Sequence, residues 1–211
     1  MSAQRLLLVV AIATLAGCSA AGRFAGTVGS GVTNLGTSAG ERVGLIRNDV
    51  LTNAQQAIAN TRINAGETTI EGHVDRADTS YEAGQPIALS VKVSKDAYVA
   101  ILSVRPNGST TLLYPNRKHP KADIAANSVV TVPNPDDPVS IKADPAGIVL
   151  FEFIASTAKD SWLFNRAADK DSDFADLGGA TRSIAKYITG SLKVNKGPET
   201  AATYLTVRVS K

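Results

Sequence analysis

The sequence predicts a mainly β protein whose core is a β-sandwich. Apolar residues alternate with smaller or polar ones over residues 87–93, and residues 98–104 are apolar at nearly every position. The first pattern is typical of a half-buried strand, and the second is typical of a strand buried on both faces. The Pro-Asn-Gly turn at residues 106–108 then lets residues 110–114 return as the next antiparallel strand.

Further short strands, separated by turn signals at regular intervals, extend this core. A parallel sheet would require helices between successive strands, so the pattern favours a sandwich over a βαβ fold. Residues 148–155 are apolar at all but one position and predict a second central strand. Residues 204–209 alternate and predict a closing strand with an exposed edge. The remaining predicted strands are residues 68–74, 129–132, 139–141 and 192–194.

Two helices are predicted around the strands. Residues 41–62 place apolar side chains three and four positions apart, beside a polar and charged face, which is typical of an amphipathic helix. This helix either covers the β core, or docks a partner or lies near a membrane surface. Residues 180–188 predict one short C-terminal helix. We therefore expect a helical segment over residues 41–66 and a sandwich domain over residues 67–211.

Composition limits the size of the core and the class of partner. The chain has 211 residues, of which 44% are hydrophobic and 19% charged, enough for one good core and too little for two large ones. Without Arg5, which lies in the leader described next, 21 basic residues face 19 acidic ones. This near balance predicts no nucleic acid or other polyanionic partner.

The N-terminus carries the most specific motif in the sequence. A basic residue precedes an apolar run over residues 6–15, which has the length of a signal-peptide core and is too short to span a bilayer. The run leads into Leu-Ala-Gly-Cys at residues 15–18, which closely resembles the lipobox of bacterial lipoproteins. The resemblance implies removal of residues 1–17 by cleavage between Gly17 and Cys18, and lipidation of Cys18. The alternative is an ordinary secretory peptide with an incidental cysteine.

Lipidation predicts where the protein is held. Each buried acyl CH₂ contributes about 0.8 kcal/mol, so the several acyl chains of a bacterial lipoprotein, palmitate among them, anchor it stably. Ser19 follows the cysteine, and by resemblance to Gram-negative sorting signals this implies the outer membrane, with the domain facing the periplasm. Because Cys18 is the only cysteine, no intrachain disulfide is expected.

Residues 18–40 are rich in glycine, serine and alanine. This composition predicts a flexible tether between the lipid and the domain. Gly36, Gly40 and Gly44 are spaced by four, which leaves close helix packing as an alternative for this segment.

Several motifs together resemble one known family. The chain is similar to domain-of-unknown-function family 4384 over roughly residues 79–156. The resemblance implies an immunoglobulin-like fold, places the domain among bacterial envelope lipoproteins, some of them associated with secretion machines, and offers no catalytic residues. The motifs are Tyr-Glu-Ala-Gly-Gln at 81–85, Asp-Ala-Tyr-Val at 96–99, Pro-Asn-Gly at 106–108, Leu-Tyr-Pro-Asn at 113–116 and Pro-Ala-Gly at 145–147.

The residues that carry chemistry point to no enzyme, metal or cofactor. His73 and His119 have no neighbour at metal-ligand spacing, so exposed histidines are expected. Residues 169–173 carry aspartates at the one-three-five spacing of a calcium loop. However, Phe174 and Ala180 occupy the positions of the required glycine and bidentate glutamate, which disfavours calcium.

Two stretches are candidate partner-binding surfaces, because aromatic residues and arginine dominate binding hot spots. The alternatives are core packing for the aromatic residues and a solvated loop for the basic ones. The candidate residues are Tyr114, Asn116, Arg117, Lys118, Trp162 and Phe164.

These predictions lead to two hypotheses of function. The first is a non-enzymatic, lipid-anchored scaffold that binds another envelope protein or assembly, for example through a strand added at residues 204–209. The alternative is an accessory module that binds a small ligand or a glycan. A scaffold should show a flat, partly apolar patch, whereas a ligand-binding module should hold a concave pocket with a few convergent polar groups.

Overall fold

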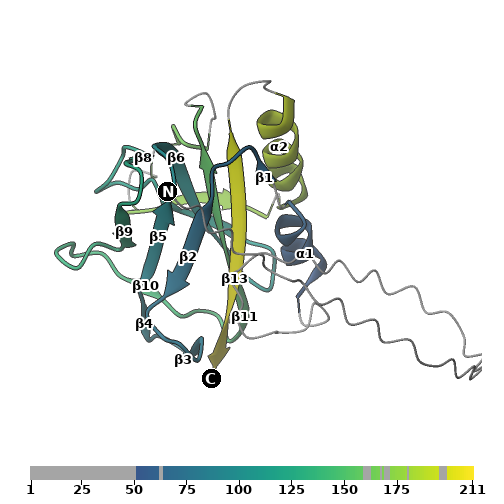
Figure 1. Ribbon diagram of the computed structural model, residues 1–211. Coiled ribbons are helices and arrows are strands. Elements are labelled where there is room, and N and C mark those ends of the chain that lie inside the picture. Colours follow the sequence, from purple (N-terminus) through teal and green to yellow (C-terminus); the bar gives the residue numbers. More distant parts are fainter. Residues whose placement is uncertain are drawn as a thin grey trace, which may run out of the picture. The chain divides into compact units, whose positions relative to one another are not determined.

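The computed structural model describes residues 51–61, 64–158, 163–166, 168, 172–179, 181–194 and 199–211. Within these residues the chain forms three β-sheets and two helices, so the prediction of a mainly β protein is confirmed. The helices lie on one face of the largest sheet, and the smaller sheets lie on its other face (Figure 1). This layering is compatible with the predicted β-sandwich.

The largest sheet is the middle layer and is centred on β11 (Gly147–Ser156), which pairs antiparallel with β13 (Thr200–Ser210) and with β6 (Ala97–Val104). Nine of the ten residues of β11 are buried, because its two faces are covered by different layers. The sheet order is β1 (Asn64–Ala65), β13 (Thr200–Ser210), β11 (Gly147–Ser156), β6 (Ala97–Val104), β7 (Thr110–Tyr114) and β12 (Ala175–Gly178), with β3 (Ser80–Glu82) paired to β13 and β8 (Asp123–Ile124) paired to β6.

The predicted hairpin at the centre of the chain is confirmed. β6 pairs antiparallel with β7, and all but two of the eight residues of β6 are buried. Gly108 in the connecting turn has a φ of 86°, a conformation that glycine adopts without strain. The hydroxyl of Thr181 donates to the carbonyl of Gly108, with 2.9 Å between the oxygens, so the start of the C-terminal helix is fastened to this turn.

Two smaller sheets cover the face of the middle layer that lies away from the helices. Gly72 lies in β2 (Ile70–Val74), a strand of the three-stranded sheet, and is half-buried. A Cβ atom at this position would lie 2.5 Å from two ring carbons of Phe153 on β11. The absent side chain therefore allows the two layers to approach closely. The first sheet contains β2 (Ile70–Val74), β5 (Leu89–Val93) and β9 (Val129–Val132), and the second contains β10 (Ile141–Lys142) and β4 (Pro86–Ile87).

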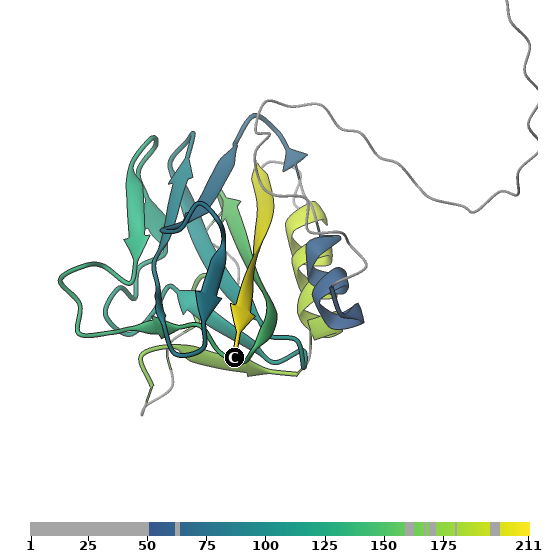
Figure 2. The same cartoon turned by 90° about the horizontal axis from the view of Figure 1, so that it is seen from below.

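Two helices, α1 (Asn53–Ala59) and α2 (Thr181–Val194), cover the other face of the middle layer (Figures 1 and 2). Thr52 is the N-cap of α1 and forms a capping box with Gln55, which satisfies backbone donors at the helix start. Gln55 and Ile58 are fully buried against the sheet. The described part of the N-terminal helical segment therefore packs on the β core.

The structure differs from three sequence predictions. The N-terminal helix is shorter than expected within the described residues, because the Thr52 capping box starts it at Asn53. The predicted strand at residues 192–194 is wrong, since these residues belong to α2. Leu192 continues the four-residue spacing of Ile184 and Ile188, so this short apolar run extends a helical stripe.

The predicted exposed edge over residues 204–209 is also wrong in its last part. β3 pairs in parallel with residues 208–210 of β13 and covers this end of the strand. β3 is only three residues long. Such a short parallel pairing between distant segments depends on tertiary packing, which leaves little periodic pattern in the sequence.

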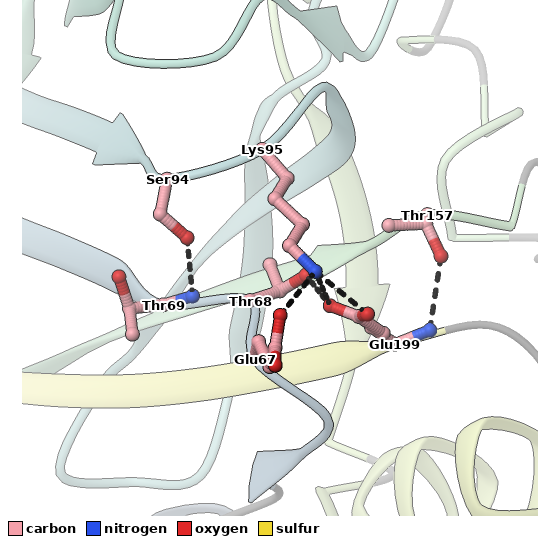
Figure 3. A network of polar contacts seen from close by, with 7 residues as sticks. All are labelled: Glu67, Thr68, Thr69, Ser94, Lys95, Thr157 and Glu199. Carbon is pink, nitrogen blue, oxygen red and sulfur yellow. Dashed lines mark hydrogen bonds and ion pairs between the residues drawn. The ribbon is translucent and has the colours of Figure 1, made fainter.

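A polar network joins distant segments at one end of the sandwich (Figure 3). Lys95 Nζ lies 2.8 Å and 2.9 Å from the carboxylate oxygens of Glu199, and 3.3 Å from Glu67 Oε2. The hydroxyl of Thr68 donates to Glu199 Oε2 at 2.6 Å. The hydrogen bond from Lys95 lowers the pKa of Glu199, and the same bond raises the pKa of Lys95.

Candidate ligand-binding pocket

A pocket lies between the middle layer and the sheet formed by β10 and β4. Its volume is about 380 Å³, within the range of sites that bind small molecules. Its floor includes a row of side chains that crosses three strands. Ser103 of β6 lies opposite Phe151 of β11 and opposite Thr111 of β7. Directly opposed residues share a face of the sheet, so the three side chains form one continuous surface.

The wall that faces this floor is held by backbone hydrogen bonds. Ile141 of β10 pairs with Ile87 of β4. Beside them, the N–H of Gly84 donates to the carbonyl of Ala143 and the N–H of Ala143 donates to the carbonyl of Gln85, both at 2.8 Å. The backbone hydrogen bonds hold this wall in place, so the wall does not depend on polar contacts of its side chains.

The lining combines an apolar surface with hydroxyl groups. Within the described part of the chain, the side-chain hydroxyls of Ser103 and Thr111 have no hydrogen-bond partner. They are therefore available to bind a polar group of a ligand. The apolar lining residues are Ile87, Leu113, Ile141, Ala143, Val149, Phe151 and Phe174.

Three charged residues line the same pocket. Arg105 is half-buried, whereas Lys142 and Asp144 are exposed. Arg105 and Lys142 form no ion pair with a carboxylate of the described residues. Two positive charges and one negative charge leave the pocket with a net positive charge.

Two residues of the predicted partner-binding surface are buried. Tyr114 is 5% exposed and its hydroxyl donates to the carbonyl of Lys121 at 2.9 Å, and burial raises the pKa of Tyr114. Asn116 is 4% exposed; its side-chain amide donates to the carbonyl of Leu113, and its oxygen accepts the N–H of His119. Both side chains thus organise the turn after β7 and offer no exposed contact surface.

The basic residues of the same turn are placed differently. Arg117 and Lys118 are exposed, which agrees with the alternative prediction that the basic residues form a solvated loop. The backbone N–H of Arg117 donates to the carbonyl of Asp173 at 2.9 Å. The turn after β7 is therefore tied to the segment that precedes β12.

The second predicted surface is only partly described. Phe164 is 3% exposed and lies in the apolar cluster on the helix side of the middle layer, with its ring centroid 6.3 Å from that of Tyr98. This placement supports core packing for Phe164. Trp162, Gly17 and Cys18 lie outside the described residues.

The histidines are separated in the fold. His73 is exposed on β2, and His119 lies 2.8 Å from Asp137 Oδ2 in a loop. Over the described ranges, no group of three or more metal-ligating side chains comes together. The aspartates at positions 169 and 171 lie outside those ranges. None of the described helices is long and apolar enough to cross a membrane.

Sequence reasoning missed the pocket, although one signal was present. Ser103 is a hydroxyl residue inside a strand predicted to be buried on both faces, and Arg105 follows two positions later, directly after the strand ends. A polar side chain at such a position needs a partner or a cavity. The predicted strands at residues 139–141 and 87–93 overlap the two strands of the opposite wall. Their pairing was not predictable, because β10 and β4 are two-residue strands that meet only in the folded chain.

The pocket belongs largely to one family-specific region of the chain. Comparison with curated proteins gives no match. Residues 80–159 match the family model described as Domain of unknown function (DUF4384), and this range contains every lining residue of the pocket except Phe174. The sequence resemblance to domain-of-unknown-function family 4384 is thereby confirmed: the chain carries a DUF4384 domain over residues 80–159.

Proposed function

We propose that this protein is a non-enzymatic binding module, anchored to the outer membrane by a lipid on Cys18 and facing the periplasm. The pocket carries this proposal. Apolar walls, unpartnered hydroxyls and a small number of charged groups gather in one cavity, and this combination is typical of ligand-binding sites. The lipobox-like residues 15–18 support the anchor.

The exposed surface favours ligand binding over a scaffold role. A scaffold for an envelope assembly, such as a secretion machine, would present a flat and partly apolar patch. Among the described residues, Val129 alone is an exposed large apolar side chain. A single exposed residue of this kind is ordinary for a protein surface, whereas the pocket is concave and mixed in chemistry. We therefore place recognition in the pocket.

The anchor is tested by envelope fractionation of wild type and two variants. Wild type should be found in the outer membrane, and Cys18→Ser should lose the acyl chains and leave it. Ser19→Asp is the matched variant: it keeps the lipid and should move the protein to the inner membrane. An outer-membrane location for Cys18→Ser would overturn the anchor.

The choice between ligand and scaffold is tested by amine-reactive cross-linking of the wild-type outer-membrane fraction, followed by mass spectrometry. Lys142 at the pocket and Lys118 in the exposed turn report on two separate surfaces. Ligand binding predicts no protein neighbour that recurs at either lysine. Repeated cross-links from Lys118 or Lys142 to one assembly would establish the scaffold role instead.

A further inference from the structure

We infer that the pocket binds an amphipathic anion, that is, a small molecule with an apolar body and one negatively charged head. This inference rests on the proposed function and names the chemical class of the ligand. It follows from the placement of apolar surface, hydroxyls and cations within one cavity.

The apolar body is accommodated by both walls of the pocket. Val149, Phe151 and Leu113 contribute apolar surface from the middle layer, and Ile141 and Ile87 contribute it from β10 and β4. These five side chains are at most 6% exposed, so an aromatic or aliphatic group would contact them through the small apolar surface that they present to the pocket. The cavity of about 380 Å³ is suited to a small molecule and is too small for a folded partner.

The charged head is accommodated by donors that line the pocket together. Ser103 lies in β6, and Arg105 follows directly after the end of this strand; both residues line the pocket. Thr111 lies opposite Ser103 on β7. Two hydroxyls and a guanidinium therefore line the same pocket, and a guanidinium forms strong, charge-assisted hydrogen bonds to carboxylate and other oxyanions.

The remaining charges select for a single negative charge. Lys142 adds a second cation from the opposite wall, and Asp144 adds one carboxylate two residues later. The net charge of the lining is positive, which favours an anion over a cation. The carboxylate of Asp144 opposes additional negative charge on the ligand, because like charges in one site repel.

This lining disfavours a neutral glycan. A sugar presents many hydroxyl groups, each of which needs a hydrogen-bond partner when buried. Seven apolar side chains line the pocket, against three hydroxyl residues. The lining thus matches a ligand whose polar atoms are concentrated at one end.

The inference is tested with two fluorescent probes that differ in charge. 8-Anilinonaphthalene-1-sulfonate carries an apolar ring system and one anionic group, and N-phenyl-1-naphthylamine is its neutral counterpart. Binding of each is titrated by fluorescence to the full chain carrying Cys18→Ser, in buffer without detergent. We expect the anionic probe to bind about three- to tenfold more tightly than the neutral probe.

Charge variants test the role of each group at the pocket. Arg105→Gln and Lys142→Gln should each weaken the anionic probe about three- to tenfold and leave the neutral probe unchanged. Asp144→Asn should tighten the anionic probe, because it removes a like charge. Lys121→Gln, which replaces an exposed cation outside the lining, is the matched control and should change neither probe.

Filling the cavity separates this inference from the proposed function. Ser103→Leu and Thr111→Leu should each exclude both probes, and circular dichroism identifies the variants that retain the fold. Equal affinity for the two probes, with no effect of Arg105→Gln, would overturn the anionic class while leaving ligand binding intact. Probe binding that persists unchanged in both filled variants would overturn the pocket as the ligand site, and with it the proposed function.

Discussion

The side-chain amide of Gln55 donates to the backbone carbonyl of Val104, with 3.1 Å between nitrogen and oxygen. The same amide nitrogen donates to the carbonyl of Ile148 at 2.6 Å. Gln55 is fully buried, and its oxygen accepts the N–H of Thr52 at 3.0 Å. One side chain of α1 thus joins the helix to β6 and β11, the two strands that carry Ser103 and Phe151 on the opposite face.

Replacing Gln55 should destabilise the domain. Gln55→Leu preserves the approximate size of the side chain but leaves two buried strand carbonyls without their donor. We expect the free energy of unfolding to fall by about 1–3 kcal/mol, measured by urea denaturation. Asn53→Ala, in the exposed first turn of the same helix, is the control and should stay within about 0.5 kcal/mol of wild type. Wild-type stability for Gln55→Leu would show that water replaces the amide.

The close contact between Gly72 and Phe153 predicts that the sandwich does not tolerate a methyl group at position 72. In Gly72→Ala the new Cβ would meet ring carbons of Phe153 at 2.5 Å, and Phe153 is fully buried, so the ring has little room to move. Such overpacking destabilises a core by about 1–3 kcal/mol. Chemical denaturation measures the change in the free energy of unfolding.

Gly179→Ala provides the control for the substitution at Gly72. Gly179 is exposed, and a Cβ at this position would meet nothing within 4 Å. This variant should lie within about 0.5 kcal/mol of wild type. Equal stability of the two alanine variants would show that the layers separate easily, contrary to a tightly packed sandwich.

The network around Lys95 predicts an acid-dependent component of stability. Because the hydrogen bond from Lys95 lowers the pKa of Glu199, the folded state binds this proton less tightly than the unfolded state does. The contribution is therefore present above the ordinary glutamate pKa of about 4.3, and it is lost as the pH falls through the lowered value. Glu199→Gln should reduce the drop in denaturation midpoint between about pH 7 and about pH 3.

Replacing Lys95, the cation that binds Glu199, tests the same acid dependence of stability. Lys95→Met removes the hydrogen bonds to Glu199, so it should also reduce the drop in denaturation midpoint on acidification. Lys121→Met changes an exposed lysine outside the network and should retain the wild-type profile. If Lys95→Met and wild type lose stability in parallel on acidification, Glu199 is not the group responsible.

The sequence predicted the long strands well, because each carries a periodic pattern of its own. The predicted strand at residues 148–155 corresponds to β11, and the predicted strand at residues 98–104 corresponds to β6. The chain then returns across the Pro-Asn-Gly turn as β7, which ends at Tyr114. The short elements were harder. β12 begins within a polar stretch and itself contains Asp176, and its pairing with β7 depends on neighbours that no local pattern identifies.

The candidate site shows the same division. Tyr114 and Asn116 were interpreted as a possible partner-binding surface because of their residue types, but their side chains are buried. Arg105 and Lys142 lie 37 positions apart in the sequence and line one pocket. Residue types thus indicated where binding chemistry exists along the chain, and packing decided which of these side chains remain accessible.

By itself, the sequence determined the β class, the central hairpin and the family resemblance around residues 80–159, because alternation and turn chemistry are local properties. The lipid-anchor prediction likewise depends on the local motif at residues 15–18. Only the tertiary structure decided that Ser103, Phe151 and Thr111 form one row beneath β10 and β4. Strand pairing joins residues far apart in the chain, and the cavity exists because two sheets meet there without filling the space between them.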